Sequence, residues 1–411
     1  MKIYNRKSNC RACGSSNLKE IIYLGETPLA DALIKKEKLN EEEIKVPLTL
    51  AFCEQCSLVQ ILEEVDPEIL FCRDYPYYSS VSKALLEHFR ESALNLIERK
   101  KLNQNTLVIE AASNDGYMLK NFVEKKIPVI GIDPAEGQAK IANQNGIFTI
   151  NDFFNIDLAK KLASEEKKAD LFLANNVLAH VPDLNGFIEG IKTILKNNGL
   201  AVIEVPYVID LVDHVEFDTI YHQHLCYFSV TALDKLFRSH NLYLNEVERI
   251  SIHGGSLRLF VEKHENVKES VIKLIKEEKN RKVDKIDFYL DFANKIKKVK
   301  SDLIKLLDSL KKDGKRIIGY GAAAKANTLQ SYIGIGKNYL DYIADLSKYK
   351  QGLYFSGNKL LIEPSSKILS DKPDYVLILA WNFANEIMRQ QQEYANNGGK
   401  FIIPIPEPKI V

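Results

Sequence analysis

Two Cys-x-x-Cys pairs, CRAC and CEQC, carry the clearest chemical signal in this chain. The first pair is Cys10 with Cys13, and the second is Cys53 with Cys56. Zinc prefers four soft ligands in a tetrahedron, and two such pairs supply them without leaving a coordination position open for catalysis. A redox function needs only one dithiol, and unrelated buried cysteines would not be paired in this way. The spacing therefore predicts a structural zinc site.

A second signal is the segment VIEAASNDGY, residues 108–117, in which a short apolar run is followed by small and polar residues. We expect a buried strand and then a loop that lets the backbone approach a ligand. The candidate ligand-binding residues are Glu110, Ala112, Asn114 and Gly116. The segment lacks the Gly-x-Gly-x-x-Gly pattern, and Asp115 would repel a pyrophosphate. A cofactor without phosphate is therefore predicted.

Each of the next two apolar runs is followed by an acidic residue, which is the arrangement found along the chain in adenosine-binding sites. Asp133, next to Pro134, is placed to take ribose hydroxyls, and Asp152 with Phe153 could offer an adenine a carboxylate and an aromatic neighbour. An acidic residue at a strand end is often only a solvated loop residue. The ordered series, rather than any single position, favours adenosine.

The third signal is the run Tyr221, His222, Gln223 and His224, in a chain that has eight histidines. In a strand or tight turn, we expect His222 and His224 to point one way and Tyr221 and Gln223 the other. A histidine in a cleft has a pKa suited to proton abstraction near neutrality. The alternative is a hydrogen-bonded surface loop.

Three further positions are weaker candidates. His180 follows the apolar run DLFLANN, at the edge where ligands bind, although a lone histidine is more often structural. His253 precedes two glycines and a serine, which could expose backbone amides to an anion or simply form a tight turn. Tyr75 and Tyr77, in DYPYYSS, could hydrogen-bond a sugar, and a packed linker is an equal contender.

Residues 317–327, IIGYGAAAKAN, place a glycine turn after an apolar run and a lysine early in the following helix. Backbone amides at a helix N-terminus bind phosphate. A lone glycine turn is weak evidence, but its place in a second α/β pattern suggests a second nucleotide-type ligand. The candidate substrate-binding residues are Gly319, Gly321, Lys325 and Asn327.

The elements that must position these residues form three predicted domains. Residues 1–70 hold both cysteine pairs and the turn-rich GETPLADALI, with little of the periodicity of a long helix or large sheet. In residues 71–285, β-branched runs alternate with helical stretches, which predicts a parallel sheet covered on both faces. Amphipathic helices over 263–313 bridge to a smaller α/β domain, so that 286–411 forms the third.

Composition limits the class of protein. Hydrophobic residues make up 45% and charged residues 27%, without a run long enough to span a bilayer or an apolar stretch after the basic N-terminus that would mark a signal peptide. We therefore expect a cytoplasmic protein with no membrane partner. Net charge is +1, from 56 basic and 55 acidic residues, which opposes nucleic-acid binding.

Together these motifs resemble the sugar C-methyltransferases that act on nucleotide-linked keto-deoxysugars, over nearly the whole chain. The resemblance implies an α/β fold with a class I S-adenosylmethionine (SAM) methyltransferase domain of Rossmann-like form, a small N-terminal zinc-binding domain and a C-terminal Rossmann-like α/β domain. It implies zinc on the four paired cysteines and SAM at the loop EAASNDG. The further SAM-binding positions that it implies are Asp133, Asn151, Asp152, Asn175 and Asn176.

The resemblance also implies a sugar pocket that contains Tyr75, His180 and the Tyr-His-x-His stretch, with the C-terminal domain helping to hold the sugar nucleotide. One residue departs from the family pattern, because Gln223 stands where the better-known members have glutamate. An amide can orient a hydroxyl or keto oxygen but cannot act as a base, so His224 becomes the stronger base candidate. We expect it to remove the C3 proton of a 4-keto sugar, while Tyr221 and His180 hydrogen-bond the enolate oxygen or neighbouring hydroxyls.

Other functions stay open on the sequence alone. The methyl group could go to C5 or to a sugar oxygen, where no enolate is needed. A zinc module is also compatible with nucleic-acid binding, although the balanced charge opposes it. Gln223 is compatible with a sugar-nucleotide-binding protein that has lost catalysis. The expected partner is the nucleotide-linked sugar alone, bound by a monomer.

Overall fold

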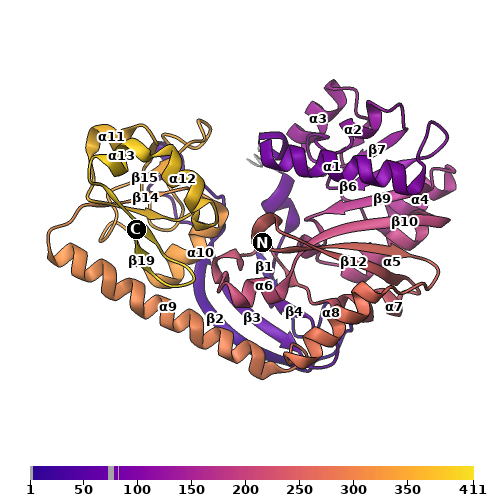
Figure 1. Cartoon of the computed structure of the whole chain (residues 1–411), viewed down its shortest axis with the longest axis horizontal. Coiled ribbons are helices and arrows are strands. Elements are labelled where there is room, and N and C mark those ends of the chain that lie inside the picture. Colours follow the sequence, from indigo (N-terminus) through magenta and orange to yellow (C-terminus); the bar gives the residue numbers. More distant parts are fainter. Residues whose placement is uncertain (1–2, 73–77, 82) are drawn as a thin grey trace.

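The computed structural model describes residues 3–72, 78–81 and 83–411. Figure 1 shows two α/β units side by side, with the long strands β2 and β3 of the N-terminal module between and beneath them. The helix α9 runs along the lower side from one unit to the other. We call these parts the N-terminal module (residues 3–65), the middle α/β unit (β6 to β13) and the C-terminal α/β unit (β14 to β19).

The middle α/β unit is built on a seven-stranded sheet in the order β12-β13-β10-β9-β6-β7-β8. Five strands, β6 to β10, are mutually parallel, and β13 is antiparallel to both of its neighbours, β10 and β12. The strands are β6 (Val108–Ala111), β7 (Val129–Ile132), β8 (Thr149–Ile150), β9 (Ala169–Asn175), β10 (Leu195–Pro206), β12 (Tyr243–Ile250) and β13 (Ser256–Glu262). The predicted parallel sheet is therefore present.

Helices cover both faces of this sheet because the strand residues are apolar on both faces. Val108 packs into a core with Phe89 and Phe122, whereas the next residue, Ile109, packs with Leu158 and other side chains on the opposite face. The helices are α1 (Lys83–Lys100), α2 (Lys120–Val123), α3 (Glu136–Gln144), α4 (Ile156–Ser164), α5 (Leu184–Ile194), α6 (Val208–Asp213) and α7 (Val230–Ser239). Loops at the carboxyl ends of the strands stay available for a site.

The C-terminal α/β unit repeats this plan on a six-stranded sheet in the order β16-β15-β14-β17-β18-β19, with only β19 antiparallel. Its strands are β14 (Ile317–Tyr320), β15 (Ile343–Asp345), β16 (Ile362–Pro364), β17 (Tyr375–Ile378), β18 (Lys400–Ile403) and β19 (Lys409–Ile410). Its helices are α10 (Ala324–Ile333), α11 (Lys367–Asp371), α12 (Ala384–Gln390) and α13 (Gln392–Asn396).

The N-terminal module contains more sheet than its pattern predicted. Its sheet has the order β11-β4-β3-β2, and β1 pairs with β5 beside it. The strands are β1 (Tyr4–Arg6), β2 (Leu18–Pro28), β3 (Lys45–Cys53), β4 (Val59–Ile61), β5 (Glu63–Val65) and β11 (Cys226–Tyr227). The register of β2 against β3 shifts twice, so bulges interrupt the period-two alternation that would have revealed a strand in GETP. The fourth strand, β11, lies outside the module in sequence and begins two residues after His224.

Two helices connect the units in the region that was predicted to be helical. They are α8 (Glu269–Asn280) and α9 (Ile286–Lys312). The buried face of α9 includes Phe292, Ile296 and Leu303, which recur at helical spacing, and Tyr289 contacts Phe52 of β3 at a ring separation of 5.0 Å. None of the helices in the described ranges combines the length and apolarity that crossing a bilayer requires.

Candidate active site

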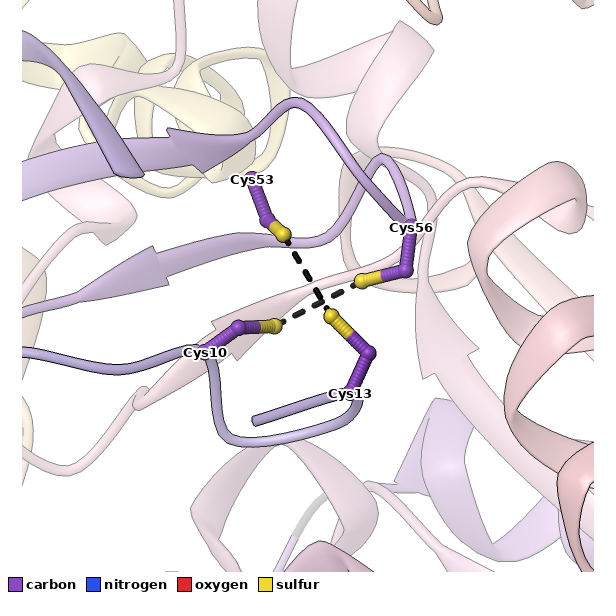
Figure 2. Close-up of side chains that lie close together, drawn as sticks. All are labelled: Cys10, Cys13, Cys53 and Cys56. Carbon is purple, nitrogen blue, oxygen red and sulfur yellow. Dashed lines mark hydrogen bonds between the residues drawn. The ribbon is translucent and has the colours of Figure 1, made fainter. Parts of the chain in front are cut away.

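The four paired cysteines meet in one cluster, as predicted. Figure 2 shows their side chains pointing toward one another from two turns of the N-terminal module. The sulfur atoms of Cys10 and Cys56 lie 3.4 Å apart, those of Cys13 and Cys53 lie 3.6 Å apart, and all four lie within 4.8 Å of one another. Zinc–sulfur bonds of about 2.3 Å in a tetrahedron place the sulfurs roughly 3.8 Å apart. The geometry and the donor set therefore fit zinc.

The zinc cluster also connects the N-terminal module to the middle α/β unit. The backbone N–H of Arg11, inside the first knuckle, donates to Gln60 Oε1 at 2.8 Å, and the Arg11 carbonyl accepts from Asn185 Nδ2 at 3.0 Å. Asn185 Oδ1 in turn lies 2.8 Å from His240 Nε2. Folding of the knuckle thus positions the module on α5 and on His240, which follows α7.

The loop after β6 has a backbone that few residues adopt. Ala112, Asn114 and Gly116 have φ values of 54°, 50° and 80°, in the left-handed region. At position 116 the positive φ favours glycine, and an added Cβ would also displace the end of the Ile147 side chain. Asn114 is held by the Ser79 backbone N–H, which donates to its Oδ1 at 3.0 Å. Strained backbone at the carboxyl end of a central strand is typical of a ligand-binding loop.

Two buried carboxyl groups lie behind this loop. Asp133 accepts backbone N–H groups of Asn114 at 2.8 Å and Ala135 at 2.9 Å, and burial raises its pKa to about 6. Glu110, in β6, accepts from Asn175 Nδ2 at 3.1 Å, and burial raises its pKa to about 8. The structure thus places Asp133 at the predicted strand end, where it also fixes the conformation of the loop.

The remaining predicted cofactor residues surround the same edge. Pro134 follows Asp133, and the Asn151 amide donates to the Asp133 carbonyl at 2.9 Å. Asp152 is exposed and accepts from the Phe153 N–H at 2.7 Å, and Phe153 is partly exposed. Four buried polar atoms at this edge have no hydrogen-bond partner among the described residues: Glu110 Oε2, Ser113 Oγ, Asp115 Oδ1 and Asn176 Oδ1. Because buried polar atoms are normally paired, this edge fits a polar ligand such as adenosine.

Tyr221 and His224 form a hydrogen-bonded pair near this edge. The Tyr221 hydroxyl lies 3.0 Å from His224 Nε2, and their rings are 4.1 Å apart. His224 Nδ1 lies 2.8 Å from the carbonyl oxygen of Thr219. A carbonyl can only accept, so Nδ1 carries a hydrogen, and in the neutral ring Nε2 accepts from the Tyr221 hydroxyl. A main-chain carbonyl thus fixes the tautomer that a general base needs.

His180 lies against the same pair, with its ring centroid 4.8 Å from that of His224. Its Nδ1 is 2.6 Å from the carbonyl oxygen of Gln223 and therefore donates to it. Burial lowers the pKa of His180 to about 4, against the opposing effect of the backbone carbonyls of Gln223 and Asn176. His180 is consequently neutral near pH 7, with a hydrogen-bond acceptor at Nε2.

The expected alternation of the Tyr-His-Gln-His run is wrong. The His224 N–H donates to the Tyr221 carbonyl at 2.8 Å, so the run forms a turn in which Tyr221 and His224 face each other. His222 is fully buried, with Nε2 3.0 Å from the Pro47 carbonyl of β3. His222 therefore packs against the N-terminal module and is not accessible to a substrate. Gln223 Nε2 donates to the Ala30 carbonyl at 3.1 Å.

The glycine turn after residue 252 does not form an anion site. The Glu216 carboxylate lies against the Cα of Gly254, where an added Cβ would be 2.5 Å from Oε1, and the Asp210 carboxylate lies in the same way against Gly255. Two carboxylates at this distance disfavour an anion electrostatically. The tight-turn alternative is the one that the structure adopts, and the side chain of His253 falls outside the description.

Two of the four predicted substrate residues of the C-terminal α/β unit are buried by the protein itself. Gly319 lies inside β14, where a Cβ would meet Leu379 at 3.0 Å, and Asn327 is 1% exposed and donates to the Leu29 carbonyl at 3.1 Å. Side chains of its own unit enclose Gly319, and the N-terminal module takes up the Asn327 side chain, so neither residue presents an open side to a ligand, and their substrate contacts stay predictions. Gly321 forms a turn with φ of 96°, and the partly exposed Lys325 lies 4.5 Å from the Trp381 ring.

Tyr75 and Tyr77 lie outside the described residues, so their predicted contacts with substrate stay predictions. Sequence reasoning missed the contribution of Thr219, whose carbonyl sets the tautomer of His224. A backbone carbonyl leaves no mark in a residue pattern. The residue pattern also gave no indication of Asp218 and Trp381, which form a hydrogen bond between the two α/β units. The only available signal was that Trp381 is the single tryptophan of the chain.

Three family models match the chain in succession. Residues 10–71 match the model described as "Putative zinc binding domain", residues 84–247 match "Methyltransferase domain", and residues 251–406 match "C-methyltransferase C-terminal domain". The cysteine cluster, the strained loop after β6 and the repeated α/β unit thus fall in separate models, in the order in which the structure arranges them.

One relative matches almost the whole chain. The C-methyltransferase NovU of Streptomyces niveus is 33% identical over 98% of this chain and 96% of its own length. Among solved structures, magnesium protoporphyrin IX methyltransferase of Synechocystis with bound SAM is 13% identical, with a TM-score of 0.34 over 44% of this chain and 79% of that one. A Burkholderia thailandensis 1,6-didemethyltoxoflavin-N1-methyltransferase is 19% identical, with a TM-score of 0.33 over 43% and 78%.

Proposed function

The chain belongs to the C-methyltransferase family, and from this premise we propose that it methylates C3 of a nucleotide-linked 4-keto-deoxysugar. It is a SAM-dependent methyltransferase with a class I Rossmann-like fold and an N-terminal zinc-binding domain. The observation that carries the proposal is the hydrogen-bond chain from Tyr221 through His224 to the Thr219 carbonyl. This hydrogen-bonded series supplies a neutral base, which removal of a C–H proton beside a ketone requires.

When bound, SAM supplies a methyl group on a positively charged sulfur that leaves as a neutral thioether. The residues that would hold it are those of the loop after β6, with Asp133 at the ribose and Asp152 and Phe153 at the adenine. The zinc site has four protein ligands and no open position, so it supplies structure only.

His224 acts as the general base. A ketone at C4 acidifies the C3–H bond, and Nε2 takes this proton while the bonding electrons form the C3–C4 double bond and the carbonyl electrons move onto O4. Nε2 can accept because Nδ1 already donates to Thr219. The enolate then uses its electron pair to form the bond from C3 to the methyl carbon, whose bond to sulfur breaks.

Tyr221 changes its hydrogen-bond role during this transfer. In the free enzyme its hydroxyl donates to His224 Nε2. Nε2 has a single lone pair, so the phenolic hydrogen turns from Nε2 to the ketone oxygen before Nε2 takes the C3 proton, and the protonated Nε2 then donates to the Tyr221 oxygen. Donors placed where charge develops stabilise it by a few kcal/mol each. One rotation of the hydroxyl therefore both frees the base and supplies the donor that the resulting negative charge requires.

His180 and Gln223 orient the sugar rather than transfer protons. Neutral His180 presents an acceptor at Nε2, so it takes a hydrogen bond from a sugar hydroxyl and does not donate to the enolate. Gln223 is fixed by its donation to Ala30, and its buried Oε1 has no partner among the described residues. A substrate hydroxyl would donate a hydrogen bond to that oxygen, just as it would to the glutamate that better-known family members have at this position.

The test combines product analysis with a base variant. The enzyme is incubated with SAM and a panel of nucleotide-linked 4-keto-deoxysugars, and mass spectrometry records the gain of one methylene. His224→Asn is expected to lower turnover about 100- to 10,000-fold, as general bases contribute. His264→Asn, at an exposed histidine, is the matched control and keeps full turnover. Unchanged turnover in His224→Asn would remove the base, and a panel without product would remove the substrate class.

Deuterium uptake gives the position of attack. With S-adenosylhomocysteine in place of SAM, the enzyme in D₂O is expected to exchange hydrogen at C3 of the sugar without methylating it, because Nε2 can still remove and return the proton. Exchange at C5 instead would move the methylation site while keeping the base.

A further inference from the structure

We infer that the C-terminal α/β unit positions the general base, through hydrogen bonds that hold the two residues flanking Thr219. This inference rests on the proposed function in that it takes His224 as the base. Thr328 of α10 and Trp381, which follows β17, are the positioning residues. Neither touches the reacting atoms, and both act through the backbone of residues 218–220.

The first contact is a side-chain bond to the main chain. Thr328 Oγ1 donates to the carbonyl of Ile220 at 2.6 Å, and both residues are buried, at 1% and 0% exposure. A buried carbonyl without this donor would lose its hydrogen bond without gaining one to water. The bond therefore fixes the orientation of the peptide group that follows Ile220, one residue beyond the Thr219 carbonyl.

The second contact lies on the other side of Thr219. Trp381 Nε1 donates to Asp218 Oδ2 at 2.7 Å, and Asp218 is fully buried. The Lys325 ammonium lies over the Trp381 ring and attracts the Asp218 carboxylate. Burying a carboxylate costs more than burying an apolar side chain of similar size, so a contact made only for packing would not need one. This arrangement favours one defined position of Asp218.

These two contacts converge on a single backbone group. Residues 217–219 form a short 3₁₀ turn, and the Thr219 carbonyl at its end accepts His224 Nδ1 at 2.8 Å and the Tyr227 hydroxyl at 3.5 Å. The residues before and after it are both held by the C-terminal α/β unit. A shift of this carbonyl would turn the imidazole and weaken its tautomer preference, and misplacing a reacting group by about 1 Å can cost on the order of 100-fold in rate.

The inference explains why this unit is present although part of its own ligand edge is filled. Tyr332 of α10 also contacts Phe217 at a ring separation of 5.6 Å, so the helix supports the whole turn. The unit then acts as a support for the turn that carries Thr219, independently of any nucleotide that it helps to bind.

The experiment compares Thr328→Val, which keeps the shape of the side chain but removes the donor, with Thr328→Ser, which restores it. Thr328→Val is expected to lower kcat and the rate of deuterium exchange at C3 by the same factor of roughly 10 to 100, with KM for both substrates within twofold of wild type. Thr328→Ser is expected to recover most of the rate. Ser331→Ala, one turn along α10, is the matched control and keeps the wild-type rate, because the Ser331 hydroxyl donates to Asn327 of its own helix and not to the turn that carries Thr219.

A second variant and a substrate-free measurement complete the test. Trp381→Phe removes the other donor and is expected to give the same pattern, while S-adenosylhomocysteine affinity reports that each variant is folded. Long-range ¹⁵N–¹H NMR of ¹⁵N-histidine-labelled enzyme reads the His224 tautomer directly, assigned with His224→Asn. Wild type should hold the hydrogen on Nδ1, and both variants should show a mixture of tautomers.

The outcomes separate the two proposals. An unchanged tautomer together with unchanged kcat in both folded variants would overturn the inference, as would a rise in KM alone. If wild type methylates none of the sugars, the proposed function fails, and the tautomer measurement still decides the positioning role.

Discussion

The ligand edges of the two α/β units share one backbone device. In the middle unit, Asp133 accepts N–H groups of Asn114 and Ala135 at 2.8 and 2.9 Å. In the C-terminal unit, Asp345 at the end of β15 accepts those of Ala322 and Ser347, both at 2.7 Å. In each case one oxygen holds the loop after the central strand, and the other holds the residue two positions further along the chain.

The surroundings of the two acids differ. Beside Asp345, the Lys350 ammonium donates to the Ala322 carbonyl at 2.7 Å and lies 3.9 Å from the Asp31 carboxylate of the N-terminal module. The third residue of the central strand is a buried carboxyl group, Glu110, in β6 but a glycine, Gly319, in β14. An aspartate in this position therefore holds the loop after the central strand in both units, although the surroundings of the two loops differ. The aspartate alone does not indicate a ligand site.

The largest predicted effect on cofactor binding contrasts these two acids directly. Asp133→Asn is expected to weaken S-adenosylhomocysteine binding about 10- to 100-fold, because a hydrogen bond to a charged group contributes roughly 1.5–3 kcal/mol. Asp345→Asn removes the same carboxylate from the filled edge and is expected to leave the Kd within twofold of wild type. Isothermal titration calorimetry measures both constants, and equal weakening in the two variants would show that the edges are not functionally different.

Local features of the middle edge were predictable because they depend on residues close in sequence. The paired cysteines, the strand that ends in EAAS and the acid in GID each specify a local conformation, and the order of strands and helices follows from their periodicity. The structure places Asp133 and the loop at one edge for that reason.

Long-range contacts were not predictable in this way. Asn327 is buried because Leu29, almost 300 residues earlier, supplies its carbonyl partner. The turn at Tyr221 and His224 is set by the chain entering β11, which pairs with β4 of the N-terminal module and leaves no room for a regular strand. Periodicity describes a segment by itself, whereas these positions depend on which distant segment packs against them.

The largest predicted effect on stability comes from the buried carboxyl that only the middle edge carries. Burial raises the pKa of Glu110 to about 8 in the folded protein from 4.5, so the folded state prefers the protonated form. Its contribution to stability is complete below pH 4.5 and is lost as the pH rises through 8, by up to about 5 kcal/mol. Glu110→Gln should therefore lose less stability than wild type between pH 5 and 9.

Urea unfolding at several pH values, without cofactor, measures this difference. Glu393→Gln, at an exposed glutamate of the C-terminal unit, is the control and should follow the wild-type curve. If the unfolding free energies of wild type and Glu110→Gln change with pH in parallel, the Glu110 carboxyl is ionised at no net cost. The difference between Glu110 in β6 and Gly319 in β14 would then have no effect on stability.

The smallest predicted effect concerns the residue that fills the C-terminal edge. Asp31 has a φ of 59°, and burial raises its pKa while Lys350 opposes that shift. Asp31→Asn keeps a side chain that tolerates this conformation and removes a costly buried charge, but it also removes the partner of Lys350. Its unfolding free energy should stay within about 1 kcal/mol of wild type. Asp31→Ala should be about 1–2 kcal/mol less stable than Asp31→Asn, because alanine is strained in the left-handed region.

Urea unfolding followed by Trp381 fluorescence measures both variants in the unit that Asp31 contacts. S-adenosylhomocysteine affinity should not change in either, since the ion pair of Asp31 is with Lys350 of the C-terminal edge. If Asp31→Ala is as stable as Asp31→Asn, the backbone at this position is not constrained by the edge that it fills. Weaker cofactor binding in both variants would instead mean that the loop around Asp31 supports the middle edge as well, and the two edges would form one coupled site.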